Sequence, residues 1–103
     1  MSLVRVAEVG DIAPGEMTSV KVSGQLTLLA NVGGAYYAIH GICTHLGCTL
    51  SNGRLNGNIV TCPCHGSRFD VTTGEVVHGP AQKPELSYSV TVEDNDILIE
   101  EQS

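Results

Sequence analysis

The chain carries two short boxes rich in cysteine and histidine, CTHLGC at residues 43–48 and CPCHGS at residues 62–67. All four cysteines of the 103 residues lie in these boxes, together with two of the four histidines. Thiolates and imidazoles two or three residues apart can converge on one metal centre from a single loop tip. Four cysteines are too few for a disulfide scaffold of this size and too many to be incidental core residues. The boxes therefore predict a metal centre built from two loops.

Three kinds of metal centre compete for these residues. A tetrahedral zinc site uses cysteine and histidine, but the boxes offer six candidates for four positions and neither has Cys-x2-Cys spacing. An iron–sulfur site held by all four cysteines would leave both histidines unexplained. In a third kind, two cysteines hold one iron and two histidines hold the other. The pattern Cys-x-His, sixteen residues, then Cys-x2-His assigns its ligands as Cys43, His45, Cys62 and His65. We favour this third arrangement because it uses both histidines of the boxes.

The rest of the chain reads as short strands separated by turns rich in Gly, Asn and Asp. No segment keeps a 3.6-residue apolar period over about ten positions, which argues against helices. The predicted strands are Leu3–Glu8, Met17–Val22, Gln25–Val32, Ala35–His40, Ile59–Cys62, Phe69–Val71, Val76–Val77, Ser87–Val92 and Asp96–Glu101. Strands at this spacing indicate an all-β sandwich or small barrel, and the length predicts a single domain over residues 1–103.

Composition and charge exclude several classes of protein. Five Lys and Arg against eleven Asp and Glu give a net charge of −6, and a nucleic-acid binder needs clustered cations instead. The chain has no apolar run of about 20 residues, so we expect no membrane segment. The first residues, MSLVRVAE, lack the apolar stretch of a secretory signal. We therefore expect a cytoplasmic protein.

The two boxes resemble those of the Rieske iron–sulfur proteins. In that family the first cysteine and the histidine of each box bind one [2Fe-2S] cluster, which implies the same four ligands as the third arrangement above. The resemblance also implies the fold: an all-β Rieske domain, an antiparallel β-sandwich with a small cluster-binding subdomain at about residues 41–69.

The remaining two cysteines resemble those of the high-potential branch of the family, where such residues form a disulfide between the loops. This implies a Cys48–Cys64 bond. In that branch a hydroxyl donor to the cluster stands at the position of Ser67, and a tyrosine stands at the position of Phe69. The resemblance thus implies a redox potential between those of the oxygenase ferredoxins and the respiratory proteins.

Three more residues are expected around the cluster. Gly66 would let backbone approach the centre closely. Pro80, in HGPA at residues 78–81, belongs to a segment that resembles the third, proline-containing loop of the family. Leu46 and Pro80 would flank the histidines and offer a partner an apolar docking patch.

The length and the segment DIAPG at residues 11–15 resemble the small soluble Rieske ferredoxins that feed ring-hydroxylating oxygenases, although those usually lack the disulfide cysteines. We therefore expect a monomeric one-electron carrier, not an enzyme, between a reductase and an oxygenase or other terminal oxidoreductase. The alternatives are a Rieske subunit or fragment of a respiratory quinol-oxidising complex, a zinc-binding interaction module and a regulatory small subunit of a larger reductase. The net charge predicts partners with basic docking faces.

Overall fold

A computed structural model describes residues 3–22, 24–43, 47–64, 66–79 and 83–100 of the chain. Within these ranges the chain forms eleven strands and one 3₁₀ helix, η1 (Leu50–Asn52), which confirms the expected all-β fold. The strands are β1 (Leu3–Glu8), β2 (Met17–Val22), β3 (Gln25–Val32), β4 (Ala35–His40), β5 (Arg54–Asn56), β6 (Ile59–Thr61), β7 (Arg68–Asp70), β8 (Val76–His78), β9 (Ser87–Tyr88), β10 (Val90–Glu93) and β11 (Asp96–Glu100). Across the described ranges, no helix has the length and apolar character needed to cross a membrane.

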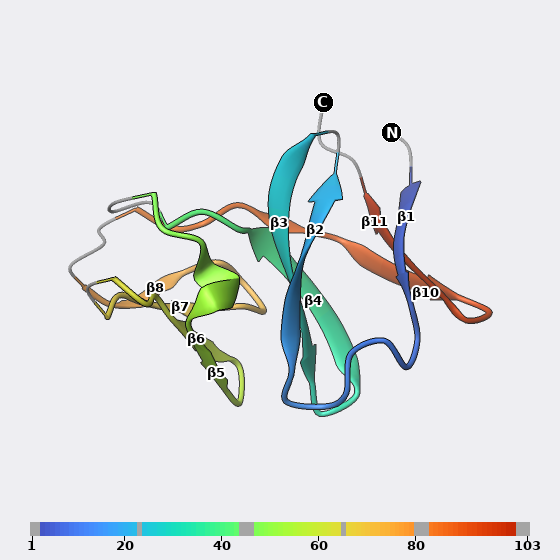
Figure 1. The fold of residues 1–103 in the computed structure, drawn as a ribbon, viewed down its shortest axis with the longest axis horizontal. Helices are drawn as coiled ribbons and strands as arrows, with labels where there is room; N and C mark the ends of the chain where they lie inside the picture. The colour runs from blue at the N-terminus through green and yellow to red at the C-terminus, as the bar shows by residue number, and fades with distance from the viewer. Residues whose placement is uncertain (1–2, 23, 44–46, 65, 80–82, 101–103) are drawn as a thin grey trace.

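The strands form three antiparallel sheets. Their strand orders are β1-β11-β10, β2-β3-β4-β9 and β5-β6-β7-β8. Figure 1 shows the third sheet at one end of the molecule and the β1-β11-β10 sheet at the other, with the β2-β3-β4-β9 sheet between them. We call residues 3–40 and 87–100 the base, and residues 41–86 the loop half.

The turn between β3 and β4 shows how the sequence sets the register of the base. Val32 pairs with Ala35, and the two residues between them, Gly33 and Gly34, have φ angles of 60° and 98°. Side chains other than glycine rarely adopt this region. Because a two-residue hairpin turn of this kind needs positive φ at both positions, the Gly-Gly pair allows it.

Strand β3 separates two apolar cores. Leu28 and Leu29 are both fully buried, and as neighbours on a strand they point to opposite faces of the sheet. Leu29 belongs to the core of the base, with Ile12, Val22, Ala38, Ile97 and Ile99. Leu28 belongs to the core that joins the base to the loop half, with Ala30, Ile39, Cys43, Leu50, Val60, Cys62, Phe69 and Val71. The two box cysteines Cys43 and Cys62 are therefore packed against the base.

The loop half departs from expectation in two respects. Strand β5 and η1 were not predicted, because each has three residues with a single apolar side chain, which is too short to show a period. The third sheet also runs to His78, past the limit of about residue 69 expected for the cluster-binding subdomain. The other three strands of this sheet, β6, β7 and β8, agree with the predicted segments to within one residue.

The expected strand at residues 87–92 is two strands in different sheets. Tyr88 in β9 pairs with Ala38 of β4, whereas Val90 in β10 pairs with Ile99 of β11. The chain crosses between the sheets at Ser89, whose carbonyl accepts a hydrogen bond from the Glu100 amide at 2.9 Å. The polar–apolar alternation continues through the crossing, which explains why the sequence suggested one strand.

Candidate metal centre

The first box forms a closed loop after β4. An isolated β-bridge between Ile42 and Thr49 holds the two ends of the loop together. Inside it, the Cys43 amide donates to the Cys48 carbonyl at 2.8 Å, and the Gly47 amide donates to the Cys43 carbonyl at 2.9 Å. Gly47 has a φ of +76°, which glycine adopts without strain. The Cys43 backbone is thus fixed from both sides.

The second box repeats this arrangement between β6 and β7. The Cys62 amide donates to the Ser67 carbonyl at 2.7 Å, and the Gly66 amide donates to the Cys62 carbonyl at 3.3 Å. Gly66 has a φ of +78°, almost the value at the fifth position of the first box. The pair of ladder residues that closes this loop is Thr61 and Arg68. The two boxes are therefore matching loops, each with a cysteine at its first position.

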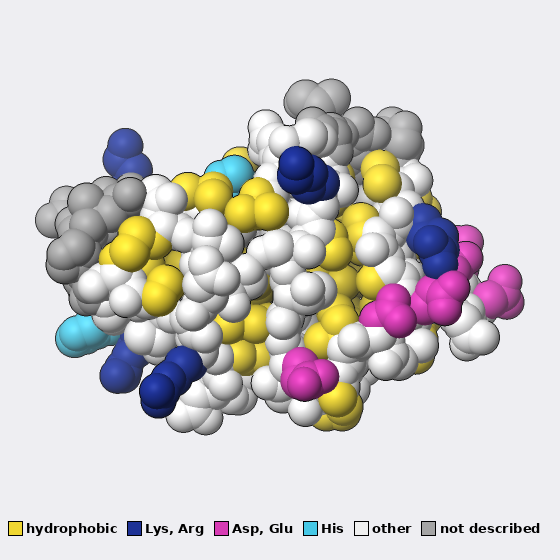
Figure 2. All heavy atoms as spheres, in the orientation of Figure 1, with side chains coloured by type: hydrophobic (Ala, Val, Ile, Leu, Met, Phe, Trp, Pro, Cys, Tyr) yellow, Lys and Arg dark blue, Asp and Glu magenta, His cyan; other side chains and the backbone are white. Residues whose placement is uncertain are grey.

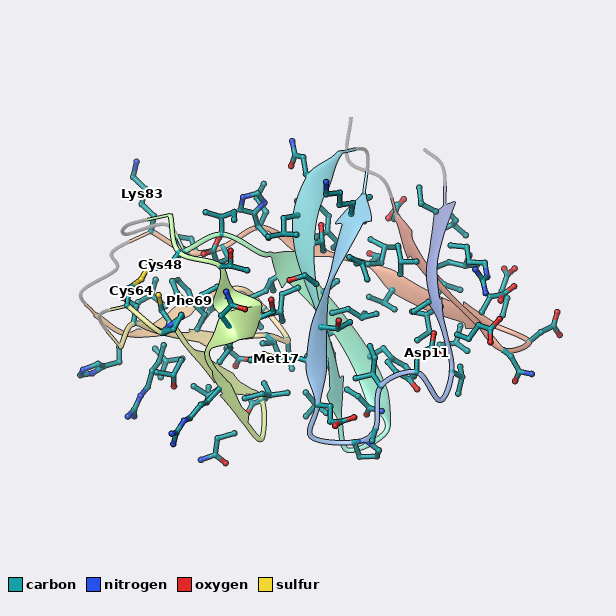
Figure 3. All side chains as sticks on the ribbon, viewed as in Figure 1. Asp11, Met17, Cys48, Cys64, Phe69 and Lys83 are labelled. Atoms are coloured by element: carbon teal, nitrogen blue, oxygen red, sulfur yellow. A yellow bond between two sulfur atoms is a disulfide. The ribbon has the colours of Figure 1, made fainter. Side chains whose placement is uncertain are left out.

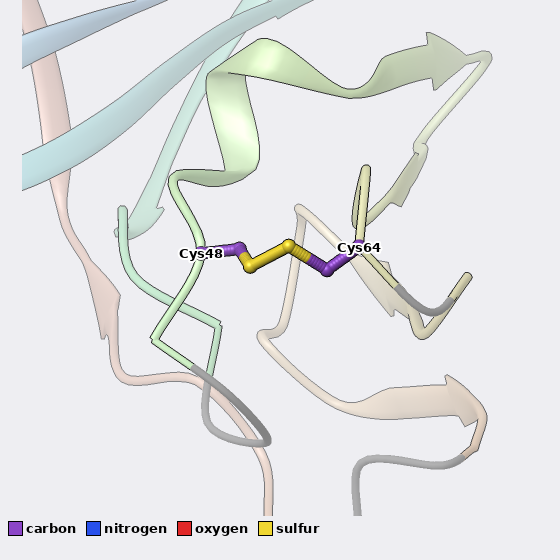
Figure 4. The surroundings of a disulfide bond; sticks show 2 residues. All are labelled: Cys48 and Cys64. Atoms are coloured by element: carbon purple, nitrogen blue, oxygen red, sulfur yellow. A yellow bond between two sulfur atoms is a disulfide. The ribbon is translucent and has the colours of Figure 1, made fainter.

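A disulfide between Cys48 and Cys64 ties the two loops together (Figure 4). The Cα atoms of this pair are 6.5 Å apart, within the range that disulfides span. This confirms the pairing that the family resemblance implied. The disulfide also excludes an iron–sulfur site held by all four cysteines, because sulfurs bonded to each other cannot act as thiolate ligands.

Cys43 and Cys62 remain outside any disulfide, and each side chain is only 3% exposed. The Cys62 sulfur lies within 4.8 Å of both disulfide sulfurs. That group of three sulfurs is not itself a metal site, since two of them are oxidised. It shows instead that the disulfide lies directly beside one predicted ligand. Two buried thiols at equivalent positions of matching loops fit an iron site, because thiolates are the soft ligands that iron–sulfur clusters use.

The other predicted ligands, His45 and His65, lie outside the described residues, as do Leu46 and Pro80. Of the predicted site, the structure therefore places the two cysteine ligands, the disulfide, Gly66, Ser67 and Phe69. It brings all of these together around the second box and its junction with the first.

Ser67 and Phe69 are both fully buried. Ser67 holds the second loop through its carbonyl, as described above, and its side chain is enclosed. Phe69 lies on β7 and belongs to the same core as Cys43 and Cys62. Figure 3 shows Phe69 close to the disulfide, at the end of the molecule that carries the boxes. Both residues are therefore placed to influence a group held by the two loops.

Asp70 follows Phe69 and stabilises the turn at the far end of β7. Its Oδ1 accepts hydrogen bonds from the Thr72 amide at 2.9 Å and the Thr72 hydroxyl at 2.6 Å. Burial by itself would raise the pKa of Asp70, but the bonds from Thr72, together with one from Asn58, outweigh it and lower the pKa. Asp70 is therefore ionised at neutral pH, and its carboxylate stabilises the turn by accepting the hydrogen bonds from Thr72.

Comparison with known proteins agrees with this geometry. The Rieske [2Fe-2S] domain model matches residues 2–97. The ferredoxin component of biphenyl 2,3-dioxygenase from Rhodococcus jostii (strain RHA1) is 35% identical over 100 residues, covering 97% of this chain and 94% of that protein. The ferredoxin of carbazole 1,9a-dioxygenase from Nocardioides aromaticivorans IC177 has a TM-score of 0.95 and 32% identity, covering 99% of this chain and all of its own.

A further solved structure is a complex of reduced oxygenase and oxidized ferredoxin in carbazole 1,9a-dioxygenase. One of its chains has a TM-score of 0.90 and 31% identity, and the match covers 94% of this chain and 91% of that one. These similarities span nearly the whole sequence rather than the boxes alone. The chain therefore belongs to the Rieske [2Fe-2S] family, and it is a ferredoxin-type electron carrier with one such cluster rather than an enzyme.

Proposed function

We propose that the chain carries single electrons from a reductase to the terminal oxygenase of a ring-hydroxylating dioxygenase system. The observation that carries this proposal is the full-length similarity to ferredoxin components of dioxygenases. The two matching loops with their buried cysteines, Cys43 and Cys62, give further support. The related complex of an oxygenase with its ferredoxin supports an oxygenase as the electron acceptor.

The proposed ligands are Cys43, His45, Cys62 and His65, as the sequence predicts. When bound, the [2Fe-2S] cluster supplies a one-electron couple. Its potential lies above that of plant-type ferredoxins because two neutral imidazoles replace two thiolates. The expected ligation thus explains why each box combines cysteine with histidine.

The described residues of the chain supply the setting for that cluster. Burial of Cys43 and Cys62 keeps water away from the thiolate side of the site. The Cys48–Cys64 disulfide and the backbone hydrogen bonds of the loops hold both cysteines in place. A rigid site changes little in geometry between oxidation states, and this favours fast electron transfer. The chain thus needs no substrate pocket to serve as a carrier.

The respiratory alternative rests on the disulfide, which resembles that of the high-potential branch. The full-length similarity to dioxygenase ferredoxins favours the soluble carrier instead.

We propose that the carrier works as a monomer in the cytoplasm. Size-exclusion chromatography with light scattering tests the first of these points, and fractionation of the producing cells tests the second.

Metal analysis and spectroscopy of the purified protein test the proposed function. We expect iron and labile sulfide in equal amounts, and a rhombic electron paramagnetic resonance signal after reduction. Oxidation of the reduced protein by a purified dioxygenase oxygenase component should restore the starting spectrum. Zinc without labile sulfide would overturn the proposal, and so would a cluster that quinol reduces but no oxygenase component oxidises.

Histidine variants test the ligands with a matched control. His45→Ala and His65→Ala should each abolish the rhombic signal. His78→Ala removes an exposed histidine outside the boxes, and it should leave the signal unchanged. Loss of the signal in all three variants would contradict the assignment of the ligands.

A further inference from the structure

The net negative charge of the chain arises outside the loop half. Residues 1–40 and 87–103 hold two Lys or Arg and eight Asp or Glu, which accounts for the whole net charge of −6. Residues 41–86 hold three of each kind. Figure 2 shows most of the acidic side chains of this face toward the end opposite the boxes, where Lys or Arg side chains also lie, whereas Lys, Arg and His side chains stand without acidic neighbours at the box end. The net charge therefore does not describe the surface near the cluster.

Two of the three Lys and Arg residues of the loop half, Arg54 and Arg68, are aligned by the register of the third sheet. Arg54 pairs with Thr61, Thr61 with Arg68, and Arg68 with His78. Paired residues of neighbouring strands lie on the same face, so these four form one row across all four strands. Arg54, Arg68 and His78 are exposed, whereas Val60 and Phe69, which alternate with them, are buried. We call Arg54, Thr61, Arg68 and His78 the cationic row.

The row lies beside the metal centre. Thr61, in the middle of the row, is followed directly by the ligand Cys62, and Arg68 follows Ser67 at the other end of the same loop. The surface of the row is also hollowed on both sides of Thr61. One hollow of about 310 Å³ is lined by Asn56, Ile59, Thr61, Arg68 and Val77. The other, of about 360 Å³, is lined by Asn52, Gly53, Arg54, Thr61, Cys62 and Pro63. Arg54 and Arg68 thus each line one of two hollows beside Cys62, a proposed cluster ligand.

The three acids of the loop half do not cancel this row. Glu85 is buried, with 4% of its surface exposed. Asp70 lies two residues from Arg68 on the same face of β7, on the side away from the box loop, where it is half-buried and accepts hydrogen bonds within its own turn. Glu75 is exposed, but its carbonyl accepts the Asp70 amide, so it lies at the far end of the third sheet from the row. Close to the box loops, the cations therefore dominate the described surface.

Distance separates the row from the acids of the base. The molecule is 39 Å long, and the third sheet and the β1-β11-β10 sheet lie at opposite ends of that long axis (Figure 1). At physiological ionic strength the Debye length is about 8 Å, so the charges at the base end are largely screened at the row. A partner approaching the cluster would meet local positive charge.

We propose that the cationic row, with the two hollows beside it, is the docking surface for a redox protein whose docking face is acidic. This inference rests on the proposed function as an electron carrier. It reverses the partner charge that the sequence suggested, because the position of the charges matters more than their sum. Arg54 and Arg68 pair with carboxylates of the partner, and the hollows beside them give its side chains room to approach. Docking there places the partner beside Cys62.

Two small oxidants of opposite charge test the local charge. The dithionite-reduced protein is mixed with anionic hexacyanoferrate(III) or cationic tris(phenanthroline)cobalt(III), between about 0.1 M and about 0.5 M salt, where screening is strong. We expect added salt to slow oxidation by the anion. Arg54→Glu/Arg68→Glu should slow the reaction with the anion on the order of tenfold, as charge steering commonly does, and speed the reaction with the cation.

Lys21→Glu is the matched control, because Lys21 is exposed on β2 of the base. Arg68→Glu changes the net charge by the same amount, so the two single variants separate local charge from net charge. We expect Arg68→Glu to slow the reaction with hexacyanoferrate and Lys21→Glu to leave it within about twofold, because the base is screened. Equal effects of the two variants, or faster oxidation by the anion as salt is added, would overturn the proposal.

A binding measurement tests the row without electron transfer. Fluorescein-labelled octaglutamate serves as the acidic surface, and fluorescence anisotropy reports its binding. We expect octaglutamate to bind the wild type and to lose binding in both Arg54→Gln/Arg68→Gln and the double glutamate variant. Labelled octalysine should bind the wild type and the glutamine variant equally, because the row contributes nothing to its binding. Equal binding of octaglutamate to the wild type and the glutamine variant would refute the row. A protein that binds octaglutamate but carries no reducible cluster would instead refute the proposed function alone.

Discussion

The base and the loop half are held together in different ways. Strand β3 of the base has eight residues and pairs with its sequence neighbours β2 and β4. The buried core of the base consists of aliphatic side chains. Each strand of the third sheet has three residues, which is the short end of the usual range of strand lengths. The loop half therefore depends on the disulfide, on packing against β3 and on the cluster. The base therefore acts as the scaffold, and the loop half carries the cysteines of the proposed cluster site on shorter strands.

Truncation of two neighbouring leucines gives the largest test of this division. Leu28→Ala opens the core shared with the loop half, and Leu29→Ala opens the core of the base. Both side chains are fully buried, so each change should lower the free energy of unfolding by about 2–5 kcal/mol. Guanidinium unfolding followed by circular dichroism measures this loss.

The two leucine variants should differ in how they hold the cluster. We expect Leu28→Ala to speed the loss of visible absorbance under mild denaturant well beyond Leu29→Ala, because only Leu28 shares a core with Cys43 and Cys62. Equal rates of absorbance loss at matched stability would show that the halves unfold as one unit.

Removal of the disulfide should weaken the loop half alone. The bond closes a loop with a sequence separation of 16, and in the chain-entropy model a loop of this size is stabilised by about 3 kcal/mol. We expect Cys48→Ser/Cys64→Ser to lose about this much stability and to release iron faster. The double variant avoids leaving one free thiol beside the Cys62 sulfur. Amide exchange in β1 and β11 should stay unchanged, and faster exchange there would contradict a local effect.

Two substitutions at buried positions test how the chain tunes the redox potential. Ser67→Ala removes an enclosed hydroxyl next to the second loop, and we expect a lower potential, because hydrogen bonds to the cluster stabilise the added electron. One bond of about 1 kcal/mol corresponds to roughly 40 mV for a one-electron couple. Phe69→Tyr adds a donor in the same core and should raise the potential. Redox titration measures both shifts, and Ser51→Ala on η1 serves as the control.

The base was largely predictable from its sequence because its strands are long and alternate. The bounds of β1, β2, β3 and β4 agree with the predicted segments. The disulfide was implied by family resemblance and is confirmed by the structure. The four-ligand assignment stays a prediction, since both histidines lie outside the described residues.

The cationic row could not be read from the sequence for a physical reason. Arg54 and Arg68 are far apart in the chain, and only the register of three-residue strands makes them neighbours across Thr61. Strand β5, which carries Arg54, has three residues and one apolar side chain, so it is too short for its alternation to reveal it. Net charge is a sum over all positions, so it misses a separation of charges that the topology alone creates.

The smallest expected effect concerns the turn at the far end of β7. Hydrogen bonds from Thr72 help to lower the pKa of Asp70 below its ordinary value of 3.8. A lowered pKa in the folded state adds stability that is fully present above the ordinary value and is lost as the pH falls through it. Thr72→Val should therefore raise the pKa of Asp70 and reduce this dependence, as a carbon-13 titration of the carboxyl would show. Thr73→Val is the matched control, because the Thr73 hydroxyl accepts the Glu75 amide instead. An equal shift in both variants would mean that the turn as a whole, rather than the Thr72 hydroxyl, keeps this carboxylate charged.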